Sequence, residues 1–321
     1  MKKIYGAVAV LLCLLLLVGC GGGQVRMGSE VEPSSSGAVQ TSQVSGEYAG
    51  YDQTRVETSP PLPIAPQEEE VQVLLDWQVL MPTREAAELS YMISRPYLFG
   101  AYPKYFSDFK GMQTATPVQI MEMGSTIAPT INVHFSWETD LEKYENHVLK
   151  KIWDDLQQED LQTTEDGTHS VEFFYASDME SALVDTFGEY PVEGKKYTDN
   201  FETNKEAGFY YYPSVDIIVR DMGDLIVFGY VERGFPVVTS LEKQGENTVV
   251  EVVRLMGSDA GDSFADFSIY DSAAGQYVDL TAENFEETTK GYEKYRYTFT
   301  KAADDGRWII VSAEKTRNRV E

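Results

Sequence analysis

The residue with the clearest chemistry in this sequence is Cys20, because a cysteine sulfur is a strong nucleophile once it is deprotonated. It follows an apolar run at residues 7–18, which is preceded by Lys2 and Lys3. The run is shorter than the roughly 20 apolar residues that a membrane-spanning helix needs. A basic start, a short apolar core and a small residue before the cysteine are typical of an export signal. The sequence therefore predicts a signal peptide at residues 1–19.

The end of this run resembles the lipobox of bacterial lipoproteins, which consists of Leu, a small or branched residue, Gly or Ala, and Cys. Leu17, Val18, Gly19 and Cys20 match it at every position. The resemblance implies a diacylglyceryl thioether on Cys20 and attachment to the outer face of the bacterial cytoplasmic membrane. Two acyl chains hold a protein stably, whereas one holds it only marginally. The alternative is a plain secretory signal that happens to end in cysteine.

Other residue types that do chemistry form no complete set. His134, His147 and His169 have none of the spacings of a helical zinc motif. Ser263 lies in Gly-Asp-Ser-Phe-Ala, which lacks the last glycine of a nucleophile elbow, and no histidine follows it in the chain. We therefore expect no metal and no cofactor, and the sequence favours a non-enzymatic role without deciding the question.

Aromatic residues offer a candidate binding surface. Residues 209–213 read Phe-Tyr-Tyr-Tyr-Pro, and neighbouring side chains of a strand point to opposite faces. Tyr210 and Tyr212 would then leave the core unless the second face of the sheet is covered by helices. Exposed aromatic rings can stack on sugars or on apolar groups of a partner. We name these two tyrosines as candidate ligand-binding residues, with a covered face as the alternative.

The charge balance limits the partners. The chain has 26 basic and 52 acidic residues, and loss of Lys2 and Lys3 with the signal leaves 24 basic residues and a net charge of −28. Nucleic acids would be repelled, so we expect no nucleic-acid partner. Cys13 leaves with the signal and Cys20 carries the lipid, so the folded part has no disulfide and must be stabilised by its apolar core.

The chain divides by composition into a tether and a folded part. Residues 20–67 contain the lipidated cysteine and a linker rich in Gly, Ser and Pro, which has too little apolar surface to fold. We expect a disordered spacer with a mean reach of roughly 40 Å. Residues 68–200 are predicted to be a helix-rich α+β part, and residues 201–321 an antiparallel sheet part.

Periodicity places the elements of an α+β fold. Helices are predicted at 83–94, at 118–123 with its end at Gly124, and at 139–156 with a capping box at Thr139. A further helix is predicted from a second capping box at Ser177 to a C-terminal Gly188. Strands are predicted at 169–175, 209–219, 224–232, 235–243, 247–256, 264–270, 293–301 and 308–313. The turn at 304–306 makes the last two strands a hairpin. The prediction is a meander-like antiparallel sheet packed against the earlier helices.

Two stretches resemble known proteins. Residues 171–188 and the ending at 295–312 are similar to uncharacterised surface lipoproteins of clostridia-type bacteria. The ending also resembles the last hairpin of the nuclear transport factor two-like α+β superfamily. The resemblance implies a lipoprotein of unassigned activity, and it transfers no catalytic residue.

The leading hypothesis is a lipid-anchored surface domain that binds an envelope protein or glycan, with the membrane contacted through Cys20. The alternative is an extracytoplasmic enzyme that acts on cell-wall glycan through carboxylates. A transporter's solute receptor is disfavoured, because such receptors alternate strands with helices over two lobes.

Overall fold

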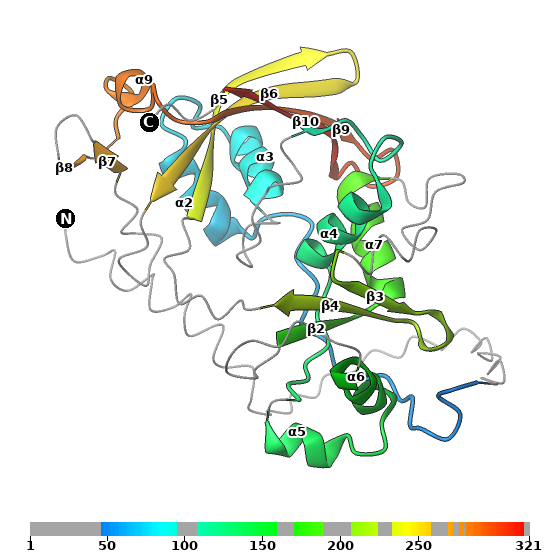
Figure 1. The fold of residues 1–321 in the computed structure, drawn as a ribbon. Helices are drawn as coiled ribbons and strands as arrows, with labels where there is room; N and C mark the ends of the chain where they lie inside the picture. The colour runs from blue at the N-terminus through cyan, green and yellow to red at the C-terminus, as the bar shows by residue number, and fades with distance from the viewer. Residues whose placement is uncertain are drawn as a thin grey trace, which may run out of the picture.

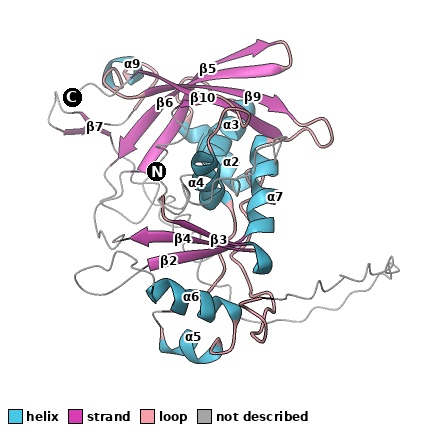
Figure 2. Cartoon of the chain, turned by 45° about the vertical axis from the view of Figure 1, so that its right-hand side comes forward, coloured by secondary structure: helices cyan, strands magenta, loops and turns pink. Residues whose placement is uncertain are grey.

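The computed structural model describes residues 46–94, 108–135, 137–158, 170–188, 207–223, 233–257, 269–271, 276–278 and 280–317. Figure 1 shows an α+β fold with most helices in the N-terminal half and antiparallel strands in the C-terminal half, which confirms the predicted class. The elements form layers: a large sheet, a group of helices, a small sheet and two outer helices (Figure 2).

The large sheet has five strands in the order β1-β10-β9-β6-β5. Its four long strands neighbour each other in chain order, so the expected meander is confirmed, and β7, β8 and α9 lie in the excursion between β6 and β9. In β9 every second residue is buried, which is the alternation that predicted this strand. The strands are β1 (Asp108–Phe109), β5 (Arg233–Gln244), β6 (Asn247–Gly257), β9 (Lys294–Lys301) and β10 (Trp308–Arg317), and the excursion holds β7 (Ile269–Asp271), β8 (Gln276–Val278) and α9 (Phe285–Thr288).

The small sheet was not predicted. Its antiparallel strands, in the order β2-β4-β3, are β2 (Ser170–Tyr175), β4 (Ile217–Gly223) and β3 (Phe209–Tyr212). The single strand expected at 209–219 is two strands, because a 3₁₀ turn (Pro213–Val215) and the left-handed Asp216 reverse the chain between them. Since β2 pairs with β4, the expected division at residue 200 cuts through this sheet. The strand predicted at 224–232 lies outside the described residues.

Besides α9, the described α-helices are α2 (Glu68–Trp77), α3 (Arg84–Ser94), α4 (Pro117–Ile127), α5 (Glu138–Lys143), α6 (Val148–Gln158) and α7 (Ala176–Phe187). The single helix predicted at 139–156 is wrong, since the chain leaves the helix after Lys143 and re-enters it at Val148. The capping box at Thr139 is also wrong: Trp137 is the N-cap of α5 and makes no side-chain cap bond.

Tertiary packing decides two more helix ends. α4 continues through Gly124, which was expected to end it, and a Cβ there would lie 2.6 Å from Cγ of Met179. This glycine lets α4 approach α7 closely. The predicted cap at Ser177 is wrong, because both the backbone N–H and the hydroxyl of Ser177 donate to the Asp216 carboxylate. Gly188 does end α7 with φ +79°, as predicted.

Hydrophobic side chains fill both faces of the small sheet. A central cluster packs between the large sheet, α3, α4, α7 and one face of the small sheet, and it includes Phe174 and Ile218. A lower cluster packs between the other face and α6, and it includes Phe173 and Val219. A third cluster joins α2, α3 and α9 to β5 and β6. Successive residues along β2, and likewise along β4, therefore pack into opposite clusters, because neighbouring side chains of a strand point to opposite faces.

The disorder expected up to residue 67 is wrong for residues 46–67, which we call the strap. Asp52 donates its N–H to the Asn146 carbonyl and accepts from the N–H of Val148, both at 2.8 Å. Tyr48 is 6% exposed and belongs to the lower cluster. The strap is ordered because its backbone forms hydrogen bonds with the folded body. The amino-acid composition of these residues does not reveal such bonds. Residues 1–45, with Leu17, Val18, Gly19 and Cys20, lie outside the described residues.

Candidate functional site

Tyr210 and Tyr212 lie on β3 and are half-buried against the lower cluster. The ring of Tyr48 from the strap meets that of Tyr212 edge-on, with 6.1 Å between ring centroids. Tyr211 packs against the central cluster on the opposite face. Both faces of this strand are covered, so the structure places the two candidate tyrosines at the border of the core and not on an exposed platform.

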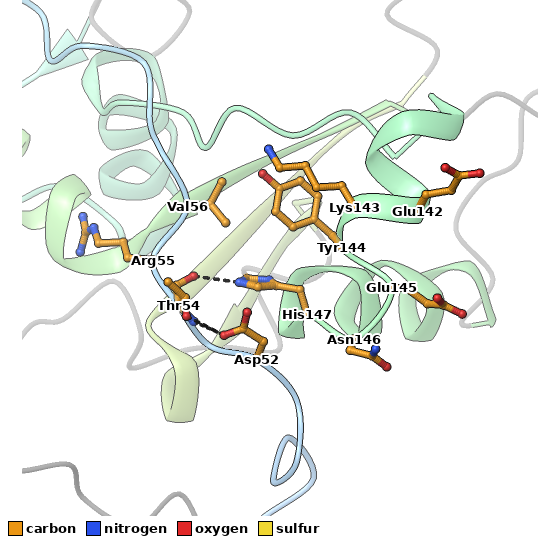
Figure 3. A pocket seen from close by; sticks show the side chains of 10 residues that line it. All are labelled: Asp52, Thr54, Arg55, Val56, Glu142, Lys143, Tyr144, Glu145, Asn146 and His147. Carbon is orange, nitrogen blue, oxygen red and sulfur yellow. Dashed lines mark hydrogen bonds between the residues drawn. The ribbon is translucent and has the colours of Figure 1, made fainter.

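A pocket of about 410 Å³ forms where the strap crosses the break between α5 and α6 (Figure 3). One wall consists of strap residues, and the other consists of residues 142–147. At the break the N–H of Val148 bonds to the carbonyl of Asp52 in the strap, and the Tyr144 carbonyl, four residues before Val148, accepts the N–H of His147 at 2.8 Å. The lining residues are Asp52, Thr54, Arg55, Val56, Glu142, Lys143, Tyr144, Glu145, Asn146 and His147.

His147 is the histidine of this pocket, and it is 6% exposed. Its Nε2 lies 2.8 Å from the carbonyl oxygen of Thr54, which can only accept, so Nε2 carries the proton. Its Nδ1 accepts the backbone N–H of Leu149 at 3.2 Å. Both ring nitrogens are therefore committed to the main chain, and the bond to Thr54 is drawn in Figure 3. The ring joins the strap to α6 instead of offering a base to a substrate.

Three charged residues of the pocket also interact with neighbours. The carboxylate of Asp52 accepts the hydroxyl of Thr54 at 2.6 Å and its N–H at 2.9 Å, and these bonds hold the pKa of Asp52 below its usual value. Lys143 lies over the ring of Tyr144, 4.7 Å from its centroid, and a hydrogen bond to Tyr144 raises the pKa of the lysine. Arg55 pairs with Asp178. Asp52, Lys143 and Arg55 therefore each interact with a neighbouring side chain.

Trp137 presents the most exposed large apolar side chain among the described residues, with 59% of its surface accessible. Its ring packs against that of His134 in a tilted arrangement, with centroids 4.4 Å apart and an interplanar angle of 38°. The backbone is fixed as well: the N–H of Trp137 bonds to the His134 carbonyl at 2.9 Å, and the N–H of His134 bonds to Asp140 at 2.6 Å. The indole is thus exposed at the surface and packed against a neighbouring ring. In the sequence, Trp137 lies two residues before the helix predicted at 139–156, and no local pattern indicates that it is exposed.

A second polar cluster lies where β6, β9 and β10 pair. The Glu293 carboxylate accepts from Lys315 and, at 2.6 Å, from the hydroxyl of Tyr295, and Arg254 lies 3.6 Å from it. Burial alone would raise the pKa of Glu293, but Lys315, Tyr295 and Arg254 together outweigh burial and hold it below its usual value. This carboxylate remains ionised at neutral pH and stabilises two largely buried cations.

Within the described ranges, no three side chains of His, Cys, Asp or Glu gather as metal ligands, and none of the helices has the length and apolarity to cross a membrane. His169, Ser263 and the lipobox residues lie outside these ranges. Comparison of the chain with protein-family models, with curated proteins and with solved structures finds no match.

Proposed function

We propose that this is a bacterial lipoprotein, held on the outer face of the cytoplasmic membrane by acyl chains on Cys20, whose folded domain binds another component of the envelope. The lipobox residues Leu17, Val18 and Gly19 support the anchor. The partner is an envelope protein or a glycan. A strongly acidic body agrees with this placement, since it stays soluble close to a membrane.

Trp137 is the observation that carries the binding function. An indole buries a large apolar area when it is covered, and its N–H can bond to a polar partner at the same time. Here the ring is 59% exposed, packs against the ring of His134, and is carried by a turn whose backbone is hydrogen-bonded. A fixed aromatic side chain loses little conformational entropy when a partner covers it. The surface around Trp137 is therefore suited to binding.

An enzyme acting on cell-wall glycan is the second candidate, and Glu172 is the observation that favours it. This carboxyl on β2 is half-buried, burial raises its pKa, and Arg220 at 3.5 Å compensates only in part. A raised carboxyl pKa is a property of the general acid in glycoside hydrolysis. Clearing of a cell-wall suspension that Glu172→Gln abolishes would support this candidate.

Mass spectrometry of the protein from cells tests the anchor. We expect a mature N-terminus at Cys20 with diacylglyceryl mass added, and retention of the protein in the membrane fraction. Cys20→Ala should remove the added mass and release the protein from that fraction. An intact Met1 or an unmodified thiol at position 20 would overturn the anchor.

Capture from solubilised envelope fractions tests the binding function, with residues 21–321 as bait. We expect a specific component to be retained by the wild type and reduced by about tenfold or more with Trp137→Ala, as truncation of a central aromatic anchor does in other interfaces. Leu80→Ala is the matched control, because Leu80 is also an exposed apolar residue, 41% accessible, on a different part of the surface. Equal retention by both variants would exclude the Trp137 surface.

A further inference from the structure

We propose that the strap is a latch: it detaches from the body as a unit while both sheets remain folded. Its contacts extend along the molecule. Asp52 bonds to the start of α6, the N–H of Val56 bonds to the hydroxyl of Tyr175 at 2.7 Å, and the N–H of Ser59 bonds to the Thr130 carbonyl at 2.7 Å. Further along, the Pro63 carbonyl accepts from the hydroxyl of Tyr91 on α3 at 3.2 Å.

The strap contacts the body mainly through backbone hydrogen bonds, and it buries few apolar side chains. Tyr48 is its buried residue, Tyr51, Val56 and Leu62 are half-buried, and most of the remaining strap side chains are exposed. Segments with few buried apolar contacts and accessible backbone hydrogen bonds open at a lower free energy than the global unfolding of the protein. The strands β6 and β9, by contrast, lie in the interior of the large sheet and are paired on both sides.

The body keeps its own scaffold when the strap leaves. The pairing of β2, β4 and β3 involves no strap residue, and neither does that of the five-stranded sheet. What opens is the side of the lower cluster that the strap covers, where Ile131, Val148 and Tyr175 are 4%, 3% and 6% exposed. Detachment therefore changes one surface of the molecule without requiring the rest to unfold.

The position of the strap determines from which end a pulling force would detach it. It is the first described segment after the predicted tether, so a pull from the N-terminal side reaches Tyr48 and Asp52 before any other part of the fold. This consequence rests on the proposed anchor, but the opening of the latch does not. The experiment below uses residues 21–321 without lipid, so its result is independent of the anchor.

Hydrogen exchange of residues 21–321, followed residue by residue, tests the opening. The reporters are amides whose bonds join strap and body, namely those of Asp52, Ser59, Asn132 and Val148. We expect them to exchange about tenfold faster or more than the amides that pair β6 with β9, and to respond less to low denaturant concentrations. Equal rates and equal denaturant dependence in both groups would overturn the proposal, since the strap would then open only by global unfolding.

A cross-link supplies the matched control. Thr58 and Ile131 form an antiparallel bridge flanked by the bonds from Ser59 to Thr130 and from Asn132 to Glu57, so they are a non-hydrogen-bonded pair. Such pairs have Cα atoms about 4.5 Å apart, which a disulfide can span. Thr58→Cys/Ile131→Cys introduces the only thiols of residues 21–321. Oxidation should slow the strap reporters to the rates of the sheet, and the reduced form of the same variant should retain fast exchange. No difference between the two forms would contradict the latch.

Discussion

Asp216 links two elements that are distant in the sequence. It is the one non-glycine residue with positive φ among the described residues, at φ 59° and ψ 31°. Its carboxylate accepts the N–H of Ser177 at 3.1 Å and the hydroxyl at 2.6 Å, and its carbonyl accepts the N–H of Ala176 at 2.9 Å. One residue therefore turns the chain into β4 and satisfies free donors at the start of α7.

Asp216→Ala should destabilise the fold by about 1–2 kcal/mol, because alanine loses the cap and is disfavoured in the left-handed region. Asp216→Asn should retain most of the stability, since asparagine tolerates this conformation and keeps an acceptor for Ser177. Urea denaturation monitored by circular dichroism measures both. Equal losses in the two variants would mean that the negative charge, and not the geometry, is what matters.

Glu293 predicts an acid-sensitive contribution to stability. Its pKa is lowered in the folded state, so the unfolded state binds more protons at acidic pH. The stabilisation is therefore complete above the unfolded pKa of about 4.5 and is lost as pH falls through the lower, folded pKa.

Glu293→Gln should lose about 3–5 kcal/mol at pH 7, because Arg254 and Lys315 would keep their largely buried charges without the carboxylate. The loss should shrink as pH is lowered below about 4.5. Denaturation curves from pH 7 to pH 3 test this, and a difference that does not change with pH would show that Glu293 contributes by packing alone. The exposed Glu286→Gln is the control.

At the scale of the elements, buried polar side chains form hydrogen bonds with the backbone at the edge strand β5. Gln78, at the end of α2, is fully buried, and its amide oxygen accepts the N–H of Val238 at 2.9 Å. Its amide nitrogen donates to Ser90 on α3, whose hydroxyl donates to the Pro236 carbonyl at 3.2 Å. The edge of β5 is thus paired with side chains, which protects it from pairing with another chain.

Gln78→Met should destabilise the protein by about 1–3 kcal/mol, because it leaves the N–H of Val238 buried without its acceptor while keeping the side-chain volume. Gln72→Met on the exposed face of the same helix should change the stability by less than about 0.5 kcal/mol. Thermal denaturation of both variants compares them directly. A neutral result for Gln78→Met would show that water replaces the amide at this edge.

At the scale of the whole molecule, the strap sets where the folded unit begins. Residues 46–67 cover part of the lower cluster and connect to α2, so the functional domain starts about twenty residues before the boundary expected from composition. The tether expected from composition is correspondingly shorter. If residues 21–45 behave as their composition predicts, their mean reach is about 25–30 Å.

Two truncations separate tether from strap. A chain of residues 46–321 should have the same melting temperature as residues 21–321, because the composition of residues 21–45 predicts no folded structure. A chain of residues 68–321 should melt lower by about 5 °C or more, since Ile131, Val148 and Tyr175 lose their cover. Differential scanning calorimetry measures both, and equal melting of all three chains would mean that the strap adds no stability.

The sequence pattern was sufficient to predict those elements whose structure is determined by residues close together in the chain. Four features were predictable because they depend on the order of consecutive residues: the alternation of β9, the glycine turn before β10, the C-cap at Gly188 and the helix at Arg84–Ser94. The anchor prediction at Cys20 has the same local character, and it stays a prediction. The α+β class follows from these elements together.

The features that the sequence did not predict depend on contacts between residues that are distant in the chain. The break between α5 and α6, the order of the strap and the small sheet each depend on backbone groups that meet partners about 40 to 95 residues away, such as Asp52 with Asn146 and β2 with β4. The covered faces of Tyr210 and Tyr212 and the exposure of Trp137 depend on the same packing. A sequence shows which side chains are available, whereas only the folded chain determines which of them are covered and which hydrogen bonds replace those of a helix.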